Sequence, residues 1–464
     1  MKQPNDHWTG LLGEAQTRAT LEQVLRLSPA DETEAALESG NAALTRFAHN
    51  VIHQNVSETH ASLEVRVVFG LRVGAADTND LSANGIQRTV DQACALAQHL
   101  PDNPDWPGLA DPLPAAGPDD PQPVLAFDEA VAGLTPAARA RTVAEVCRAA
   151  HSEQLLASGA FSSSYGESAV INSHGLFAYA PATEIDLTFV VEQPDEKASA
   201  YGHAIGWQMA QVGVDSLALE TVRRAKASRR PRPVPAGEYP VVLDPYAVAS
   251  LLESLAEAGM GALPVQEERS WMNGRLGRRC FSPDLTILDD AYDPRGVPQS
   301  FDCEGVPKQR VPIVVSGVPI SPVYDRLTAA RETGRFSTGH AQPYADEDWD
   351  GPLPDNLSLL PGELSIDEMI ERIDRGLYVT RLWYVNLLSP HDCTLTGMTR
   401  DGVWWIQNGE LAHPAENLRF DQSLVEALAN LRGVGRERRT VAGFFGGVHR
   451  VPALAFDSFR FVAP

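Results

Sequence analysis

The chain has 464 residues, which is long enough for two or three domains with hydrophobic cores of their own. Its composition, 43% hydrophobic and 21% charged, is typical of a soluble globular protein. No stretch approaches the roughly 18 uninterrupted apolar residues that are needed to span a bilayer. The formal net charge of −23 repels phosphate backbones, so direct nucleic-acid binding is not expected.

Two features predict a cytoplasmic protein. Residues 1–7 lack the apolar core that a secretion signal requires. The five cysteines are widely scattered and form no CxxC pair: Cys94, Cys147, Cys280, Cys303 and Cys393. An odd, sparse set of this kind fits a reducing compartment better than a disulfide framework.

Two proline-rich segments, 101–123 and 230–235, divide the chain because repeated prolines prevent a continuous helix. We take them as boundaries and predict three pieces, which span 1–105, 124–228 and 236–464. Just before the second boundary, the dense basic run from Arg223 to Arg232 could bind an anionic ligand. A solvated linker is the simpler interpretation, because prolines follow at once.

The first piece reads as strands with flanking helices. A helical pattern near residues 21–25 is followed by alternating apolar and polar residues over 62–69, which indicate a half-buried strand. Gly70 and Gly74 bracket a predicted turn into a partner strand. Ser82 can then cap a helix, whose apolar positions lie on one face: Ile86, Val90, Cys94 and Ala97.

The middle piece predicts a helix and an antiparallel meander. Thr135 is a capping residue, and Pro136 follows at the first helical position. Two long β-like runs, 160–172 and 176–191, are joined by a short Ser-His-Gly turn, and residues 194–197 turn the chain back again.

The third piece begins with a strand over 239–243 and a helix that Asp244 and Pro245 start. The sequence beyond this helix predicts mainly strands and loops. One further helix is predicted to begin with the capping box Ser365 to Glu368 and to end at Gly376. The whole pattern predicts an α+β fold, in which an N-terminal α+β region with an antiparallel sheet precedes a β-rich C-terminal domain.

Chemical motifs are scarce. The sequence has no phosphate loop, no dinucleotide fingerprint, no GxSxG nucleophile elbow and no HExxH motif. Four scattered residues of the third piece are candidates for a non-standard metal site: His340, His391, Cys393 and His413. Residues spaced in this way are more often surface or loop residues than ligands.

Two acidic pairs could act in acid–base chemistry: Asp289 with Asp290, and Asp302 with Glu304. They follow strand ends and turns, where carboxylates also accept hydrogen bonds from backbone N–H groups. No catalytic constellation emerges from spacing alone.

A resemblance to a known family comes from several segments in succession. The sequence reads GLRVGAADTNDLS over 70–82, FSPDLTILDD over 281–290, FDCEGVP over 301–307 and STGHA over 337–341. In this order the segments resemble those of the TldD/PmbA family, except that Cys303 stands where the family has an acid. Further similar segments continue to the C-terminus.

This resemblance implies both a fold and a function. The fold is an α+β N-terminal region and a β-rich C-terminal domain. In the family, a TldD subunit carries zinc on an HExxxH helix and a later cysteine, and a TldE (PmbA) subunit pairs with it as a heterodimer. The pair is a cytoplasmic metallopeptidase that processes unstructured peptides.

The zinc-binding positions decide which subunit this chain resembles. Leu252 and Glu257 occupy the two histidine positions of HExxxH, and only the glutamate is retained, as Glu253. Leucine cannot ligate zinc, and one glutamate leaves no histidine pair to hold the ion. The C-terminal stretch 434–452 has no cysteine. The resemblance therefore implies a TldE-like chain without catalytic or metal-binding residues, and places the zinc in a TldD-like partner.

Two alternatives remain open from the sequence. The chain could be an autonomous metal-dependent peptidase that uses the non-standard set named above. It could also be a stand-alone peptide-binding protein without a peptidase partner.

Overall fold

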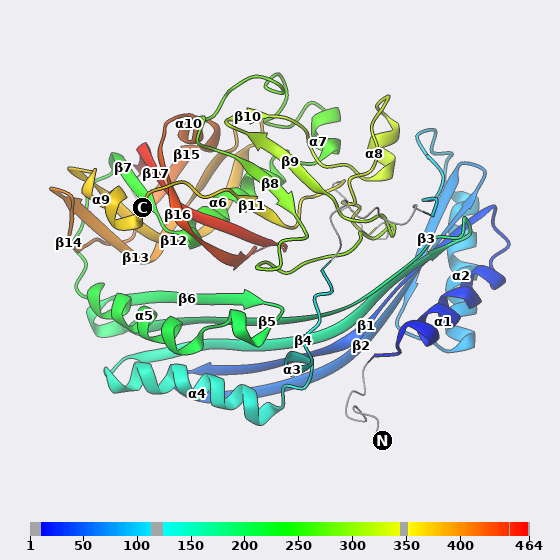
Figure 1. Cartoon of the computed structure of the whole chain (residues 1–464), viewed down its shortest axis with the longest axis horizontal. Helices are drawn as coiled ribbons and strands as arrows, with labels where there is room; N and C mark the ends of the chain where they lie inside the picture. The colour runs from blue at the N-terminus through cyan, green and yellow to red at the C-terminus, as the bar shows by residue number, and fades with distance from the viewer. Residues whose placement is uncertain (1–10, 113–123, 344–350, 445, 463–464) are drawn as a thin grey trace.

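The computed structural model describes residues 11–112, 124–343, 351–444 and 446–462. One long antiparallel sheet forms the N-terminal half, and a β-rich domain lies across one face of that sheet (Figure 1). The predicted α+β fold is therefore confirmed.

The N-terminal sheet joins the first and middle pieces of the chain. Its six strands run in the order β3-β2-β1-β4-β5-β6, and each pairs antiparallel with its neighbours. The strands are β1 (Glu32–Ala48), β2 (Val51–Phe69), β3 (Arg72–Thr78), β4 (Leu156–Asn172), β5 (Phe177–Gln193) and β6 (Ala198–Gly206). Because β1 pairs with β4 over most of its length, the sheet is continuous across the proline-rich segment.

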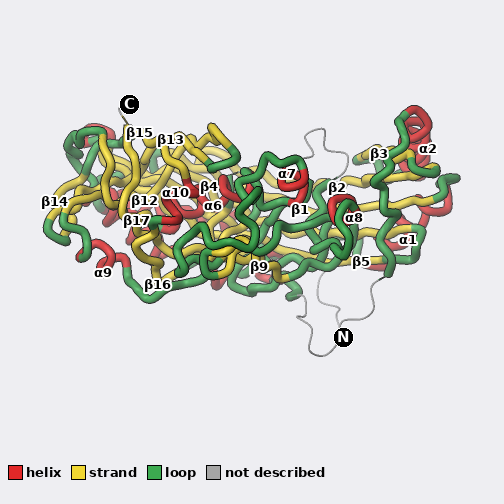
Figure 2. Tube along the Cα trace, turned by 90° about the horizontal axis from the view of Figure 1, so that it is seen from above, coloured by secondary structure: helices red, strands yellow, loops and turns green. Residues whose placement is uncertain are grey.

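Helices cover one face of this sheet in two groups. Alternate residues of each strand point to that face, as the two-residue period of a strand requires. One group packs on β1–β3 and the other on β4–β6. The helices are α1 (Glu14–Leu27), α2 (Ala83–His99), α3 (Glu129–Ala132), α4 (Pro136–Ser152) and α5 (Val214–Ala227). Figure 2 shows that the end with α1, α2 and β3 projects past the C-terminal domain.

The C-terminal domain is built on a second sheet of eleven strands. Part of the pairing closes into a ring, because β17 pairs with both β15 and β7 and the path β15-β13-β12-β7 connects them. The strands are β7 (Gly237–Leu243), β8 (Ile287–Asp290), β9 (Arg310–Val315), β10 (Val318–Pro319), β11 (Leu357–Leu359), β12 (Arg375–Ser389), β13 (Thr394–Gln407), β14 (Glu410–Pro414), β15 (Arg419–Ser423), β16 (Leu431–Ala442) and β17 (Val448–Val462).

The helices of this domain are short except for α6, which packs into its main core. They are α6 (Pro245–Glu257), α7 (Ala262–Gln266), α8 (Arg326–Ala330), α9 (Ile366–Glu371) and α10 (Leu424–Ala429). Two 3₁₀ turns, Pro194–Glu196 and Met209–Gln211, flank β6. No helix among the described residues combines the length and apolarity that crossing a bilayer would demand.

Several local predictions are confirmed because short-range chemistry determines them. The Ser82 side chain accepts a hydrogen bond from the Gly85 N–H and caps α2. Thr135 caps α4 in the same way, and Ser365 and Glu368 form the predicted capping box of α9. The predicted meander is the β4–β5–β6 unit.

Three local predictions are wrong. The turn before β3 is at Gly70, whereas Gly74 lies within β3, where its lack of a side chain lets the strand approach α2 closely. Gly376 does not end α9, which stops at Glu371, but lies inside β12. The beginning of the basic run is not a solvated linker: it forms the last turn of α5, where Arg224 is paired with the fully buried Asp244 at 3.0 Å.

Candidate functional site

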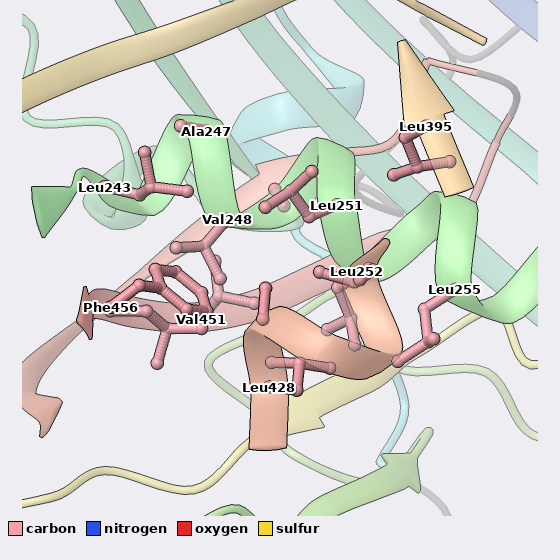
Figure 3. Packing of buried hydrophobic residues seen from close by; sticks show 14 of the residues in the cluster. Leu243, Ala247, Val248, Leu251, Leu252, Leu255, Leu395, Leu428, Val451 and Phe456 are labelled. Carbon is pink, nitrogen blue, oxygen red and sulfur yellow. The ribbon is translucent and has the colours of Figure 1, made fainter. Parts of the chain in front are cut away.

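Helix α6 lies where the C-terminal domain meets the N-terminal sheet. Asp244 caps it by accepting a hydrogen bond from the Tyr246 N–H, and Pro245 occupies its first position. Leu251, Leu252 and Leu255 enter the core (Figure 3). The opposite face contributes Tyr246 and other residues to a cavity. The helix thus has an apolar face and a site-forming face.

The three positions that the resemblance aligns with HExxxH have different environments. Leu252 is 4% exposed and packs in the core, so an imidazole there would be surrounded by carbon (Figure 3). Glu253 is 8% exposed and lines the cavity. Glu257 is exposed at the end of the helix. The residues present do not fit a zinc ion, because none of these three side chains is an imidazole and they do not face one point.

The cavity has a volume of about 460 Å³ and lies between the two halves of the chain. Strands β5 and β6 form one wall, and α6, β12 and the end of β16 form the others. The lining includes Asp186, Thr188, Tyr201, His203, Tyr246, Ser250, Glu253, Arg381, Trp383, Tyr384, Val441, Gly443 and Phe444. A cavity of this size, mostly apolar with a few polar groups, is typical of a ligand site.

Two polar side chains of the cavity wall, His203 and Arg381, are held by partners. The Nε2 atom of His203 is 2.7 Å from a carboxylate oxygen of Asp186. The Arg381 guanidinium stacks 3.8 Å from the centre of the Tyr201 ring and lies 2.6 Å from Asp401. Such stacking and ion pairing hold arginine in one position. Both groups are therefore fixed parts of the wall.

Tyr246 connects α6 to the N-terminal sheet. Its hydroxyl donates to the carbonyl of His203 at 3.0 Å and accepts from the guanidinium of Arg439 at 3.1 Å. One terminal nitrogen of Arg439 in turn donates to both carboxylate oxygens of Glu220 on α5, at 2.6 and 2.7 Å. Burial raises the pKa of Tyr246, so the hydroxyl keeps its proton at neutral pH. These hydrogen bonds connect the C-terminal domain to the N-terminal half and fix the position of the cavity wall.

The mouth of the cavity is marked by an irregular segment of β12. The pairing of β12 with β13 shifts between Trp383 and Asn386, and Tyr384 has a φ of +54°. Left-handed backbone at a non-glycine residue in a bulge often accompanies functional sites. Tyr384 and Phe444 are each 77% exposed at this mouth. The bulge therefore presents aromatic side chains at the entrance.

The candidates for a non-standard metal site do not come together. His340 is fully buried between Thr338 and Asp289, at 2.9 and 3.0 Å. His391 is exposed, and His413 bonds the carbonyl of the next residue, Pro414. Cys393 is buried against α6 with its thiol 3.7 Å from the Ser254 carbonyl, and burial raises its pKa. In the described ranges, no three His, Cys, Asp or Glu side chains are grouped so as to hold a metal.

The acidic pairs of the third piece lie away from the cavity lining. The Asp289 carboxylate binds His340 and the Asn356 N–H, and Asp302 accepts backbone N–H bonds from Glu304, Val306 and Ala341. Glu304 lies 3.5 Å from Arg66 of β2. These contacts indicate structural roles at strand ends and between domains.

Sequence reasoning missed most of the cavity residues. Asp186, Tyr201, His203 and Arg381 belong to strands that are distant in the chain, and none is part of a motif. The only signal was weak: polar and aromatic residues alternate along β5 and β6 on the face opposite the helices. Their convergence depends on the placement of β12 and α6.

The class of protein follows from the similarity of each part of the chain to known metallopeptidase domains. Three domain families match the chain: PmbA/TldA metallopeptidase domain 1 over residues 33–97, the central domain over 125–229 and the C-terminal domain over 236–462. The chain belongs to the PmbA/TldD family.

Individual relatives agree with this assignment. Metalloprotease PmbA of Escherichia coli O157:H7 is 26% identical over 461 residues, which cover 96% of this chain and 95% of the relative. A PmbA homologue of Haemophilus influenzae is 25% identical over 82% of each chain. The crystal structure of TldE from Thermococcus kodakarensis has the same fold, with a TM-score of 0.84, 20% identity and coverage of 96% of this chain and 100% of that one.

Proposed function

We propose that this chain is a non-catalytic, TldE/PmbA-like subunit that pairs in the cytoplasm with a TldD-like metallopeptidase to process unstructured peptides. The relatives named PmbA and the structural likeness to a TldE support this subunit type. The five cysteines are all free thiols, as expected in a reducing compartment.

The single observation that carries the proposal is the environment of Leu252. Its side chain is enclosed by apolar residues of the C-terminal core, and Glu257 points to solvent one turn further on. A hydrolytic zinc ion needs three protein ligands and an open position for water. Because α6 offers no imidazole at these positions, but only the carboxylates of Glu253 in the cavity wall and Glu257 at the surface, we assign the zinc of the complex to the partner.

The contribution of this chain is then to bind and position the peptide. The cavity is open at the β12 bulge, where the backbone leaves regular pairing. Extended peptides bind sheet edges through main-chain hydrogen bonds, and pockets take alternate side chains. The cavity supplies such a pocket between the domains.

Co-purification and metal analysis test the proposal. The full chain is prepared alone and together with a TldD-like chain from the same cell, and each sample is assayed for zinc and for cleavage of an unstructured peptide. We expect the chain alone to hold no stoichiometric zinc and to be inactive, and the 1:1 complex to be active.

Stoichiometric zinc and cleavage by the isolated chain would overturn the proposal in favour of an autonomous peptidase. The Cys393→Ser variant then identifies the site, since loss of activity would implicate the non-standard set. Absence of any complex with a TldD-like chain would instead favour a stand-alone peptide-binding protein.

A further inference from the structure

Three arginine side chains gather on one face of the β16–β17 pair, outside the lining of the cavity. Arg438 of β16 lies opposite Pro452 of β17, and two residues further along Thr440 lies opposite Arg450. Opposite residues of an antiparallel pair share a face, as do residues two apart, so Arg438 and Arg450 occupy diagonal positions about 7–8 Å apart. Thr440 donates a hydrogen bond to the carbonyl of Arg295 at 2.8 Å, which brings the third arginine to the same face.

One carboxylate, that of Asp293, lies between two of these arginines. It accepts hydrogen bonds from Nε of Arg295 at 2.9 Å and from its Nη2 at 3.1 Å, and a third from Nη1 of Arg450 at 2.7 Å. Against the opposing effect of burial, the hydrogen bonds from Arg295 and the charge of Arg450 lower the pKa of Asp293 to about 2. Asp293 is therefore ionised at neutral pH and offsets one of the three positive charges.

The remaining charge at this face is positive. Burial and the nearby charges of Arg450 and Arg295 lower the pKa of Arg438 to about 10, whereas a close anion would raise it. The neighbouring carboxylate of Asp290 pairs with a fourth arginine, Arg310, at 3.1 Å. Four arginines and two aspartates leave two positive charges in excess. Repulsion of an anion by the net charge of −23 is largely screened beyond about 8 Å at physiological ionic strength, so the local charges decide.

Two of the guanidinium groups have an unused edge. Arg438 donates through Nη1 to Ser358 Oγ at 2.9 Å and to the carbonyl of Leu359 at 3.4 Å, and Arg450 donates through Nη1 to Asp293. Within the described part of the chain, Nε and Nη2 of both arginines form no hydrogen bond, and these atoms are not among the enclosed polar atoms. The Nε–Nη2 edge of a guanidinium is a fork that binds two oxygens of one oxyanion. The face therefore offers two free forks side by side.

We propose that Arg295, Arg438 and Arg450 form a binding site for a phosphate group. A phosphate group carries about −1.5 to −2 charges near neutral pH and has three strong acceptor oxygens, which match the excess charge and can serve two forks at once. A carboxylate carries one charge and two oxygens, which one fork already satisfies. The inference goes beyond the proposed function, since the site lies outside the cavity that takes the peptide. Inorganic phosphate and a phosphate monoester present the same chemistry to it.

Calorimetric titration of the full chain with sodium phosphate and with sodium acetate, at pH 7.5 and constant ionic strength, tests this inference. We expect saturable 1:1 binding of phosphate and at least tenfold weaker binding of acetate, because acetate has one charge and fills one fork. Titration with glycerol phosphate, a phosphate monoester, distinguishes the two sources of the group. Equal affinity for the ester supports a site for the phosphate group of a larger ligand, and binding of phosphate alone supports a site for the free ion.

Variants of β16 locate the binding. Arg438→Gln removes one fork and one charge and should weaken phosphate binding at least tenfold. Arg438→Lys keeps the charge but not the fork, and most of the affinity should still be lost, since an ammonium group is a point charge. Arg436→Gln is the matched control, because Arg436 is an exposed arginine of the same strand that binds Glu363 and Glu368, and the affinity should be unchanged.

Because Arg438 also bonds Ser358, circular dichroism checks that its variants are folded. Arg295→Gln is a second variant that does not depend on this check, since the Arg295 side chain is 64% exposed, and it should weaken phosphate binding about threefold or more. Absence of saturable phosphate binding overturns the site, as does equal affinity for phosphate and acetate. An affinity that is unchanged in both Arg438→Gln and Arg295→Gln would place the bound phosphate elsewhere and would also overturn it.

Discussion

The interface between the N-terminal sheet and the C-terminal domain has polar side chains at both ends, but the two ends use them differently. At the ion-pair end, the buried Arg66 guanidinium on β2 contacts the carboxyl groups of both Glu34 and Glu304. At the cavity end, a volume of about 460 Å³ is open between the two halves of the chain. One end joins the domains, and the other is available to a ligand.

Two histidines of the C-terminal domain illustrate the difference. His340 and His449 are both buried, yet His340 bonds Thr338 and Asp289 on either side of its ring. His449 has neither bond. A buried polar group with partners stabilises a fold, whereas one without partners costs free energy that binding can recover. Burial alone therefore does not show that a polar residue stabilises the fold; its hydrogen-bond partners do.

The largest effect should come from breaking the ion-pair end. Arg66→Ala leaves the buried carboxylate of Glu34 without its cation and removes the contact with Glu304, and it should lower the free energy of unfolding by about 3–5 kcal/mol, measured by urea denaturation. Arg88→Ala is the control, because Arg88 pairs with Asp80 on the surface and should cost at most about 1 kcal/mol. Equal losses in the two variants would contradict the role of Arg66.

The second-largest effect should be the difference in stability between substitutions on the two faces of α6. Leu252→Ala removes a core side chain and should cost about 2–5 kcal/mol, whereas Ser250→Ala trims a residue beside open space and should cost less than about 0.5 kcal/mol. Thermal and urea unfolding of both variants measure the difference. If Ser250→Ala proved as destabilising as Leu252→Ala, the cavity face would be a packed core.

The pH dependence of the free energy of unfolding should reveal the lowered pKa of His449. Because burial lowers its pKa to about 4, the folded protein binds fewer protons than the unfolded chain between that value and the ordinary range of histidine near 6.5. The contribution of the neutral His449 ring to the free energy of unfolding is complete above that range and is lost as the pH falls. We expect the wild type to lose roughly 3 kcal/mol relative to His449→Leu between pH 7.5 and 4. Parallel pH profiles of the two proteins over this range would contradict the buried, neutral state of His449.

The smallest predicted effect is at the ion-pair end, where stability is expected to be lost as the pH rises and not as it falls. Burial, together with Asp302 and Glu34, raises the pKa of Glu304 against the opposing charge of Arg66. The folded state therefore holds a proton that the unfolded state releases, and stability is lost as the pH rises above the ordinary range of glutamate. Glu304→Gln should reduce this alkaline loss by on the order of 1 kcal/mol, measured as urea midpoints at pH 6 and 9. An unchanged slope would contradict the buried, protonated state.

Local signals predicted much of the fold. Caps such as Ser82, Thr135 and Ser365 act within three residues, so their helices could be read directly. The long β1 strand was missed, because its sequence includes Gly40 and Asn41 and mixes small and polar residues. Gly40 is needed there because β4 passes very close to it, at Gly166, which is a contact between segments more than a hundred residues apart.

The sequence by itself determined the fold class, the chemistry of α6 and the family resemblance, because residue types and short-range spacing are sufficient for each. A leucine at position 252 cannot bind zinc in any fold. Only the tertiary structure decided that Glu253, Gly446 and His449 meet at Gly443, and that β5 and β6 complete the cavity. The physical reason is that hydrophobic packing and strand pairing bring distant residues together, and no local pattern records which of them will share a space.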